Sequence, residues 1–472
     1  MKKTSFALAA GLVLAVGCDT PTVTNENAAT TAALQGALTS AGLQTLATGV
    51  VASDRSFITG FNYAIEPEIF ARDAYRIDSN EPRYVTETLG GTPDPGGFSA
   101  SGGFSAGYTA IRAATTLIDA LPGADPNSIS DAQRNAAAGF IKTIKALDYY
   151  RLLELRDTIG VAIQTSDVTY VPPFSCKKNT LDYIGALLDS ANTNLAAGST
   201  SLPFNLPTGF TAYGRNYTQT ANVIKFNRGL KGKVDVYRGL QHTSPVASAF
   251  ASAITELTQA LGGAAPGAVP ASTFATGAYI TFVAGGTENT PNPLSDAKVG
   301  VNPKAQAALQ AGDTRASKII TRVSAPVTLA GSGLTTTLTY VGSNTAVSAN
   351  QTKPLAILRD EEVVLLRAQA YFEAGQFANG AADLNSVRTN YGLAPIAVPA
   401  DIATARTALL YEKRYSLFFE GPQRLVDLRA YGMLKAGGSI PAELPGDPFN
   451  TALPIPKSEA DARGNNLTVV CP

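Results

Sequence analysis

The fold is decided by residues 359–391, which read RDEEVVLLRAQAYFEAGQFANGAADLNSVRTNY. The apolar residues of the first half lie on one face of a predicted helix: Val363, Leu366, Ala370 and Tyr371. This helix is expected to stop at Gly375, because glycine readily takes the left-handed conformation that ends helices. A second apolar face follows at once and consists of Phe377, Ala381, Leu384 and Val387. The stretch therefore predicts a helix hairpin.

The hairpin resembles a tetratricopeptide unit, in which paired helices stack through contacts between small and large side chains. Its small residues are Ala368 and Ala381, and its aromatic residues are Tyr371 and Phe377. Further one-sided helical patterns lie earlier in the chain: Tyr108, Ile111, Thr115 and Ile118; Phe140, Ile144, Leu147 and Tyr150; Phe226, Leu230, Val234 and Tyr237. We interpret residues 108–156 and 223–240 as degenerate copies. The predicted fold class is all-α, with little β structure.

The hairpin is followed by another predicted helix, which begins after the N-cap Asp401 and runs to Glu420, where Gly421-Pro422 ends it. A short helix around Leu425 comes next. Residues 255–350 are rich in Gly, Ala, Pro and Thr and predict loops, with a hairpin at Gly331-Ser332-Gly333. The glycine-rich stretch 90–107 is likewise expected to be irregular. Such segments on a rigid frame commonly carry binding sites.

The N-terminus predicts export. Lys2 and Lys3 precede an apolar run from Phe6 to Val16, which is shorter than the roughly 20 residues that a membrane-spanning helix needs. Residues 1–17 therefore read as a signal peptide. The run ends in Ala-Val-Gly-Cys18, which resembles a lipobox whose cysteine carries lipid, although alanine replaces the usual leucine. The alternative is an ordinary secretory signal with an incidental cysteine. Residues 18–31 predict a flexible tether.

Composition excludes several function classes. The chain has 37 basic and 37 acidic residues, and no basic run longer than Lys177-Lys178, which argues against nucleic acid as a partner. It has one histidine, His242, and three cysteines, which are too few for a zinc site. A histidine-dependent hydrolase would have to rely on His242, which we expect at the surface. No metal or cofactor is expected.

If Cys18 carries lipid, Cys176 and Cys471 remain. An exported protein matures where disulfides persist, so the two can form a bridge. Two free buried thiols are the equal alternative, because sequence gives no distance between them.

Residues 410–429 read LYEKRYSLFFEGPQRLVDLR and carry the most specific motif, made of Glu412, Arg414, Phe419, Glu420, Gly421, Arg424, Asp427 and Leu428. Together with the hairpin, with Gly312-Asp-Thr-Arg315, and with Pro454-Ile-Pro456, Glu459 and Asn465, it resembles the SusD/RagB family of nutrient-binding outer-membrane lipoproteins. The resemblance implies one α-helical domain over residues 32–472, with the family's C-terminal segment at about 355–472. It also implies a lipid-anchored protein that binds an oligosaccharide or similar nutrient without covalent chemistry. Its implied partner is a TonB-dependent, SusC-like β-barrel transporter.

Charges in the motif favour structure over catalysis. Helical spacing lets charged side chains form ion pairs that fix how helices meet, so we interpret Arg414, Glu420, Arg424 and Asp427 as structural.

Sugar binding without chemistry needs aromatic faces and polar side chains on a concave surface. The candidate ligand-binding residues are Asn62, Tyr63, Arg72, Asp73, Tyr75, Arg76, Tyr84, Phe98 and Phe104. The alternative for each is burial in the core or exposure on a solvated face. Because the chain has no tryptophan, a peptide or another nutrient is an equally open ligand.

Two other functions fit parts of the pattern. A periplasmic scaffold would bind protein segments in a groove between the helix pairs. A glycan hydrolase would need two carboxylates about 5 to 10 Å apart across a cleft, and no sequence feature marks such a pair.

Overall fold

The computed structural model describes residues 38–167, 169–241, 246–282, 292–323, 326–329, 331–341 and 352–471. The expected signal peptide, Cys18, the tether and His242 lie outside these residues.

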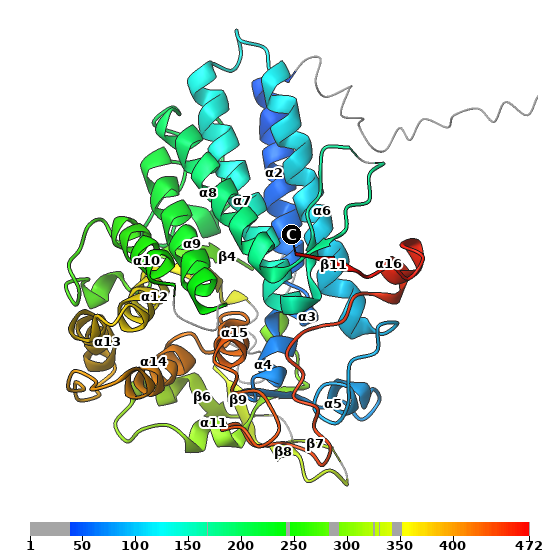
Figure 1. Ribbon diagram of the computed structural model, residues 1–472, viewed down its shortest axis with the longest axis vertical. Helices are drawn as coiled ribbons and strands as arrows, with labels where there is room; N and C mark the ends of the chain where they lie inside the picture. The colour runs from blue at the N-terminus through cyan, green and yellow to red at the C-terminus, as the bar shows by residue number, and fades with distance from the viewer. Residues whose placement is uncertain are drawn as a thin grey trace, which may run out of the picture.

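Helices dominate the described chain (Figure 1). The longer helices are α2 (Ser40–Ile58), α6 (Phe98–Ala120), α7 (Asp131–Arg156), α8 (Lys177–Ala196), α9 (Thr220–Leu240), α10 (Ala247–Ala260), α12 (Asp360–Glu373), α13 (Phe377–Asn390), α14 (Ile402–Ser416) and α15 (Gln423–Ala430). The shorter helices are α3 (Phe61–Ala64), α4 (Glu66–Phe70), α5 (Arg83–Thr86), α11 (Pro303–Ala307) and α16 (Lys457–Ala462). The predicted all-α class is confirmed.

Strands are short and form small separate sheets. They are β1 (Ala74–Arg76), β2 (Val161–Ala162), β3 (Phe174–Ser175), β4 (Gly277–Ile280), β5 (Val299–Val301), β6 (Ile319–Thr321), β7 (Val327–Thr328), β8 (Thr335–Thr336), β9 (Leu338–Tyr340), β10 (Leu355–Arg359) and β11 (Val469–Val470). The antiparallel pairs are β1 with β5, β4 with β10, β6 with β9, and β7 with β8, while β2, β3 and β11 share one sheet. The pair β7 and β8 forms where the sequence predicts a hairpin.

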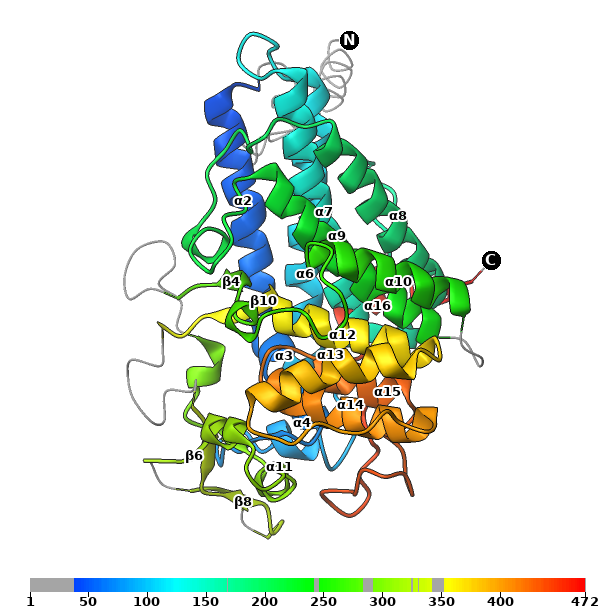
Figure 2. The ribbon, with the colours of Figure 1, turned by 90° about the vertical axis from the view of Figure 1, so that its left-hand side faces the viewer.

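Helices that are consecutive in the chain pack against each other. From α6 to α10 each helix contacts the next, α10 contacts α12, and α2 lies along α6. Helices α12 to α15 continue the stack in the lower half of the molecule, above α11 and β8 (Figure 2). This is the arrangement that repeated helix pairs produce.

The hairpin of α12 and α13 forms as predicted. Gly375 has φ 74°, so it takes the left-handed conformation that lets the chain turn. Gly380 lies under the ring of Phe372, where a Cβ would come within 2.5 Å of Cδ1. Arg367 and Asp383 join the two helices through a buried ion pair of 2.8 Å. Tight packing and a paired charge therefore fix the crossing of the two helices.

Helix α14 begins as predicted, because the Asp401 side chain accepts a hydrogen bond from the Thr404 N–H at 2.8 Å. It ends at Ser416, four residues before the expected Glu420. The chain turns away because Phe419 and Gly421 both take positive φ, of 60° and 96°.

The expected irregularity of residues 90–107 is wrong for its second half, because α6 starts at Phe98. Its glycines do not break the helix but let it approach α7. A Cβ on Gly103 would lie 2.9 Å from Leu155 Cδ1, and one on Gly107 would lie 2.7 Å from Leu152 Cδ2. Glycine inside a helix often has such a packing reason.

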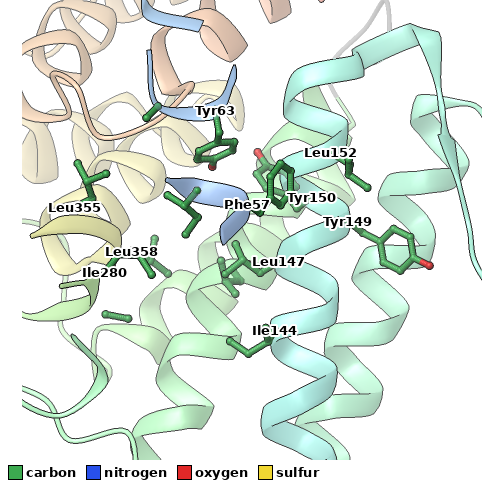
Figure 3. Packing of buried hydrophobic residues seen from close by; sticks show 14 of the residues in the cluster. Phe57, Tyr63, Ile144, Leu147, Tyr149, Tyr150, Leu152, Ile280, Leu355 and Leu358 are labelled. Atoms are coloured by element: carbon green, nitrogen blue, oxygen red, sulfur yellow. The ribbon is translucent and has the colours of Figure 1, made fainter. Parts of the chain in front are cut away.

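The main core lies where α2, α3 and α7 meet β4 and β10 (Figure 3). Phe57, Tyr63 and Tyr150 are buried together, with Ile280 and Leu358 on the facing strands. Tyr149 points to the other side of α7, where its ring meets Tyr183 of α8 edge-on at 5.3 Å. Helix α7 therefore packs against other elements on both of its sides.

Candidate functional site

A small hydrophobic cluster, separate from the main core, underlies the candidate site. Phe104 of α6, Ala162 of β2, Phe174 of β3 and Ile455 are buried together, and Val469 of β11 packs against them. Strand β11 pairs in parallel with β3, and β3 pairs antiparallel with β2. The end of the chain is therefore part of the same layer as α6.

A pocket of about 430 Å³ opens above this cluster. It is lined by Phe104, Ser105, Tyr108, Thr109, Arg112, Gln164, Ser458 and Glu459. One wall is α6, and the opposite wall is α16. The lining combines a phenyl ring, a phenol ring, three aliphatic hydroxyl groups, an amide, a guanidinium and a carboxylate.

Hydrogen bonds hold the lining side chains in place. Arg112 donates to the Gln164 side chain at 3.0 Å and to the Thr165 carbonyl at 3.1 Å. The Tyr108 hydroxyl accepts from the Ala162 N–H at 2.8 Å, which fixes its ring 4.7 Å from that of Phe104. A lining held in this way is organised before any ligand arrives, which reduces the entropy lost on binding.

The α16 wall is tied to the body of the protein. Cys176 and Cys471 form a disulfide, with 5.2 Å between their Cα atoms. Arg463 pairs with Glu459 at 2.7 Å and donates to the Pro172 carbonyl at 2.7 Å. Its guanidinium also lies 4.3 Å from the ring centroid of Phe174. Of the two alternatives that the sequence leaves open for the cysteines, the structure has the bridge.

An aromatic cluster lies at the first residue of α6. The rings of Phe61, Tyr84 and Phe98 are 4.3 to 6.0 Å apart, and all three are partly exposed. The Arg76 guanidinium covers Tyr84 at 3.3 Å from the ring centroid, and its Nε donates to Asp296 at 2.8 Å. Cation–π contact and ion pair together hold the cluster in one arrangement.

The outer face of α6 connects the cluster with the pocket. Phe98, Ser101, Ser105, Thr109 and Arg112 recur at steps of three and four, and none is buried. At about 1.5 Å per residue, Phe98 and Ser105 lie roughly 10 Å apart along the helix. An extended ligand can therefore contact both places at once.

The nine residues that the sequence selects are not all gathered there. Tyr84 and Phe98 belong to the aromatic cluster, Arg76 covers it, and Phe104 borders the pocket. The other five are buried, and their polar atoms are used inside the fold: Asn62 with Glu66, Tyr63 with Glu154, Arg72 with Asp447, Asp73 with Arg414, and Tyr75 with Glu443. For these five residues the structure shows burial in the core, which was the alternative to ligand binding.

Two buried charges support the first turn of α6. Arg156 donates to the Ala100 carbonyl and to the Pro454 carbonyl, each at 2.8 Å, so it joins α6 to the C-terminal segment. Burial lowers the Arg156 pKa to about 10. Glu66 accepts from Asn62 at 2.9 Å, and burial raises its pKa to about 7.

The four charged residues interpreted as structural, Arg414, Glu420, Arg424 and Asp427, each form an ion pair, but none pairs within the set. Arg414 and Arg424 share Asp73, Glu420 pairs with Arg359 at 2.7 Å, and Asp427 pairs with Lys413 at 2.7 Å. The partners come from elements far apart in the sequence. These residues join helices to one another and do not line the pocket above α6.

No group of histidine, cysteine, aspartate and glutamate within the described ranges is arranged to hold a metal ion. None of the helices in that part of the chain is both long enough and apolar enough to cross a bilayer.

Sequence reasoning missed most of the pocket. Ser105, Thr109 and Arg112 lie on the polar side of α6, whereas Gln164 comes from the loop after β2 and Ser458 from α16. The hydroxyl side chains that recur on one face of α6 could have indicated the pocket, but only if residues 98–107 are first recognised as helical.

Comparison with solved structures supports the fold described above, whereas two other comparisons find no match. No protein-family model matches the sequence, and no curated protein matches it. Among solved structures, a SusD superfamily protein from Bacteroides fragilis is 16% identical, with a TM-score of 0.65 and coverage of 90% of this chain and 97% of that one. The surface glycan-binding protein A from Bacteroides uniformis is 14% identical, with a TM-score of 0.65 and coverage of 89% and 97%.

A laminarin-binding SusD-like protein is 17% identical, with a TM-score of 0.60 and coverage of 89% of this chain and 97% of that chain. Likeness at such low identity establishes architecture, and it extends over most of both chains. The chain has the fold of SusD superfamily proteins.

Proposed function

We propose that this protein binds an oligosaccharide along the outer face of α6 without altering it. In this proposal Cys18 carries a lipid anchor at the outer-membrane surface, and the protein delivers its ligand to a TonB-dependent, SusC-like transporter. The observation that best supports this proposal is the pocket of about 430 Å³ between α6 and α16 on a SusD-like fold. Two proteins of similar fold are named for binding a surface glycan and laminarin.

The pocket lining supports a sugar as the ligand. The partly exposed ring of Tyr108, which packs on the buried ring of Phe104, offers an apolar face, while Ser105, Thr109 and Ser458 offer hydroxyls that both donate and accept hydrogen bonds. Sites for small molecules commonly combine an apolar lining with a few placed polar groups. Among the described residues that line the pocket, Glu459 is the single carboxylate, whereas glycoside hydrolysis commonly uses two, and Glu459 is paired with Arg463.

The binding test fills the pocket. Ser105→Trp places a large ring at an exposed lining position, and Thr193→Trp places the same ring on an exposed face of α8. Both variants and the wild type are titrated with laminarin and with a panel of plant and bacterial polysaccharides. We expect Ser105→Trp to lose the glycan that the wild type binds, with its melting temperature unchanged, and Thr193→Trp to keep it. Equal binding by all three proteins would rule out the α6 face.

The absence of catalysis is tested on the same glycan. Prolonged incubation with the wild type should produce no new reducing ends. Release of reducing ends that a single carboxylate substitution abolishes would overturn the proposal in favour of a hydrolase.

The proposed location of the protein and its proposed transporter partner are tested in whole cells. Cys18→Ala should release the protein from membranes, whereas the wild type should be cleaved by protease added to intact cells. Gentle detergent extraction should recover the wild type with a large β-barrel protein. Protection from external protease would instead favour a periplasmic scaffold.

A further inference from the structure

A second pocket, of about 270 Å³, lies away from the α6 face and shares no lining residue with the first. Strands β4, β9 and β10, the residue after α13 (Tyr391) and the turn after α14 surround it. Its lining consists of Ala275, Tyr279, Asn292, Lys318, Tyr340, Lys353, Pro354, Leu355, Ala356, Arg359, Tyr391, Phe419 and Glu420. Its volume is just under the roughly 300–1,000 Å³ of pockets for drug-sized ligands, so it suits a smaller molecule.

Positive charge in this pocket exceeds negative charge. The lining and its edge hold three cations, Lys318, Lys353 and Arg359, against two carboxylates, Glu361 and Glu420, and the Glu420 carboxylate lies 2.7 Å from Arg359. Lys318 and Lys353 have no carboxylate partner within ion-pair distance among the described residues. The excess favours an anionic ligand.

Lys318 is positioned by the backbone and keeps a free donor. Its ammonium donates to the Tyr415 carbonyl at 2.8 Å and to the Ser416 carbonyl at 2.6 Å. An ammonium group has three N–H donors, so one is left for a ligand. Burial lowers the Lys318 pKa to about 8, which reflects the desolvated surroundings of this charge.

Aromatic rings form another part of the lining. Tyr340 and Phe419 are stacked, with centroids 5.1 Å apart and planes inclined by 5°. The Tyr340 hydroxyl makes no hydrogen bond to any residue that the structure describes, whereas the Tyr279 hydroxyl donates to Ala275 and the Tyr391 hydroxyl to Glu361. A flat ring with a free hydroxyl can contact a sugar ring and one of its hydroxyls.

We propose that this pocket binds an acidic monosaccharide unit, with the sugar carboxylate at Lys318 and Lys353 and the sugar ring against Tyr340. Charge-assisted hydrogen bonds from the lysines to the carboxylate give the affinity. The ring and hydroxyl of Tyr340 distinguish a sugar acid from a simple carboxylic acid. This second site is independent of the glycan site proposed on α6.

The test titrates the full-length protein with glucuronate, galacturonate, glucose and acetate. We expect the two sugar acids to bind and glucose and acetate not to bind. Failure of both sugar acids to bind would overturn the proposal, and binding of acetate as tight as that of glucuronate would overturn the part assigned to Tyr340.

Variants then locate the site. Lys353→Glu and Tyr340→Phe change side chains of the pocket, and Lys435→Glu reverses an exposed charge elsewhere. We expect Lys353→Glu to weaken glucuronate binding by roughly tenfold or more, Tyr340→Phe to weaken it less, and Lys435→Glu to leave it unchanged.

Equal affinity in all three variants would place the sugar acid outside this pocket and refute the proposal. Neutral glycan binding, which Ser105→Trp is expected to abolish, serves as the internal reference. Because Lys353→Glu should leave neutral glycan binding intact, failure of one site is distinguishable from failure of the other.

Discussion

Arg414 donates from Nε to Oδ1 of Asp73 at 2.9 Å, and this contact joins residues 341 positions apart. Arg424 lies 3.3 Å from the same carboxylate oxygen, so one buried aspartate holds two arginines of the C-terminal motif. Asp73 precedes β1, while the arginines lie in α14 and α15. The contact therefore fixes the last helices of the stack against the first third of the chain.

Asp73→Asn should destabilise the protein strongly. The substitution leaves two largely buried guanidinium groups without their carboxylate, and breaking a buried ion pair typically costs about 3–5 kcal/mol. Urea unfolding would measure the change. The control is Asp131→Asn, which removes an exposed carboxylate from a pair within one helix turn and should cost less than about 1 kcal/mol. Similar losses in the two variants would contradict the structural role of Asp73.

Glu66→Gln should remove part of the pH dependence of stability. Burial raises the Glu66 pKa to about 7 from its ordinary value of 4.5. Because burial disfavours the ionised form of Glu66, this residue does not lower the free energy of unfolding below pH 4.5. Between pH 4.5 and 7 it lowers that free energy increasingly, and above pH 7 the loss is complete. The full cost is about 3 kcal/mol. Unfolding free energies at pH 4.5 and 8 should therefore converge more for Glu66→Gln than for wild type, and parallel curves would refute this.

Replacing both bridged cysteines, in Cys176→Ser with Cys471→Ser, should weaken the α16 wall. Loss of a native disulfide typically costs about 2–5 kcal/mol, and glycan binding should fall because Ser458 and Glu459 lose their support. Calorimetry and glycan titration measure the two effects. A reducing agent should reproduce both in wild type and change nothing further in the double variant. Unchanged glycan affinity after reduction would show that the disulfide does not support the glycan site.

Gly107→Ala should destabilise the contact between α6 and α7. The added Cβ would lie 2.7 Å from Leu152 Cδ2, and overpacking of this kind typically costs about 1–3 kcal/mol. Gly49→Ala is the matched variant, because Gly49 lies in α2 with nothing within 4 Å of its Cβ position. Alanine there should stabilise by about 0.5–1 kcal/mol through helix propensity. Thermal unfolding should move in opposite directions for the two variants.

The elements predicted from sequence are those with local signals. The Gly375 turn and the Asp401 cap each act within a few residues, so the hairpin and the start of α14 are found correctly. The start of α6 is missed because Gly103 and Gly107 look like helix breakers until Leu155 and Leu152 are known to lie opposite them.

The pocket is harder still to predict, since its walls come from α6 and α16, which are more than 300 residues apart. The ion pairs show the same limit. Charged residues such as Arg414 are recognisable as structural, but their partners are set by tertiary packing.

The bridge between Cys176 and Cys471 spans 295 positions, and it secures the wall that completes the pocket. During synthesis the residues of that wall therefore emerge after every long helix has left the ribosome. A product that stops after α15 contains all the long helices that the structure describes but has neither α16 nor β11. The pocket above α6 is therefore complete only once the final segment has been synthesised, so the glycan binding proposed for it requires the whole chain through Cys471.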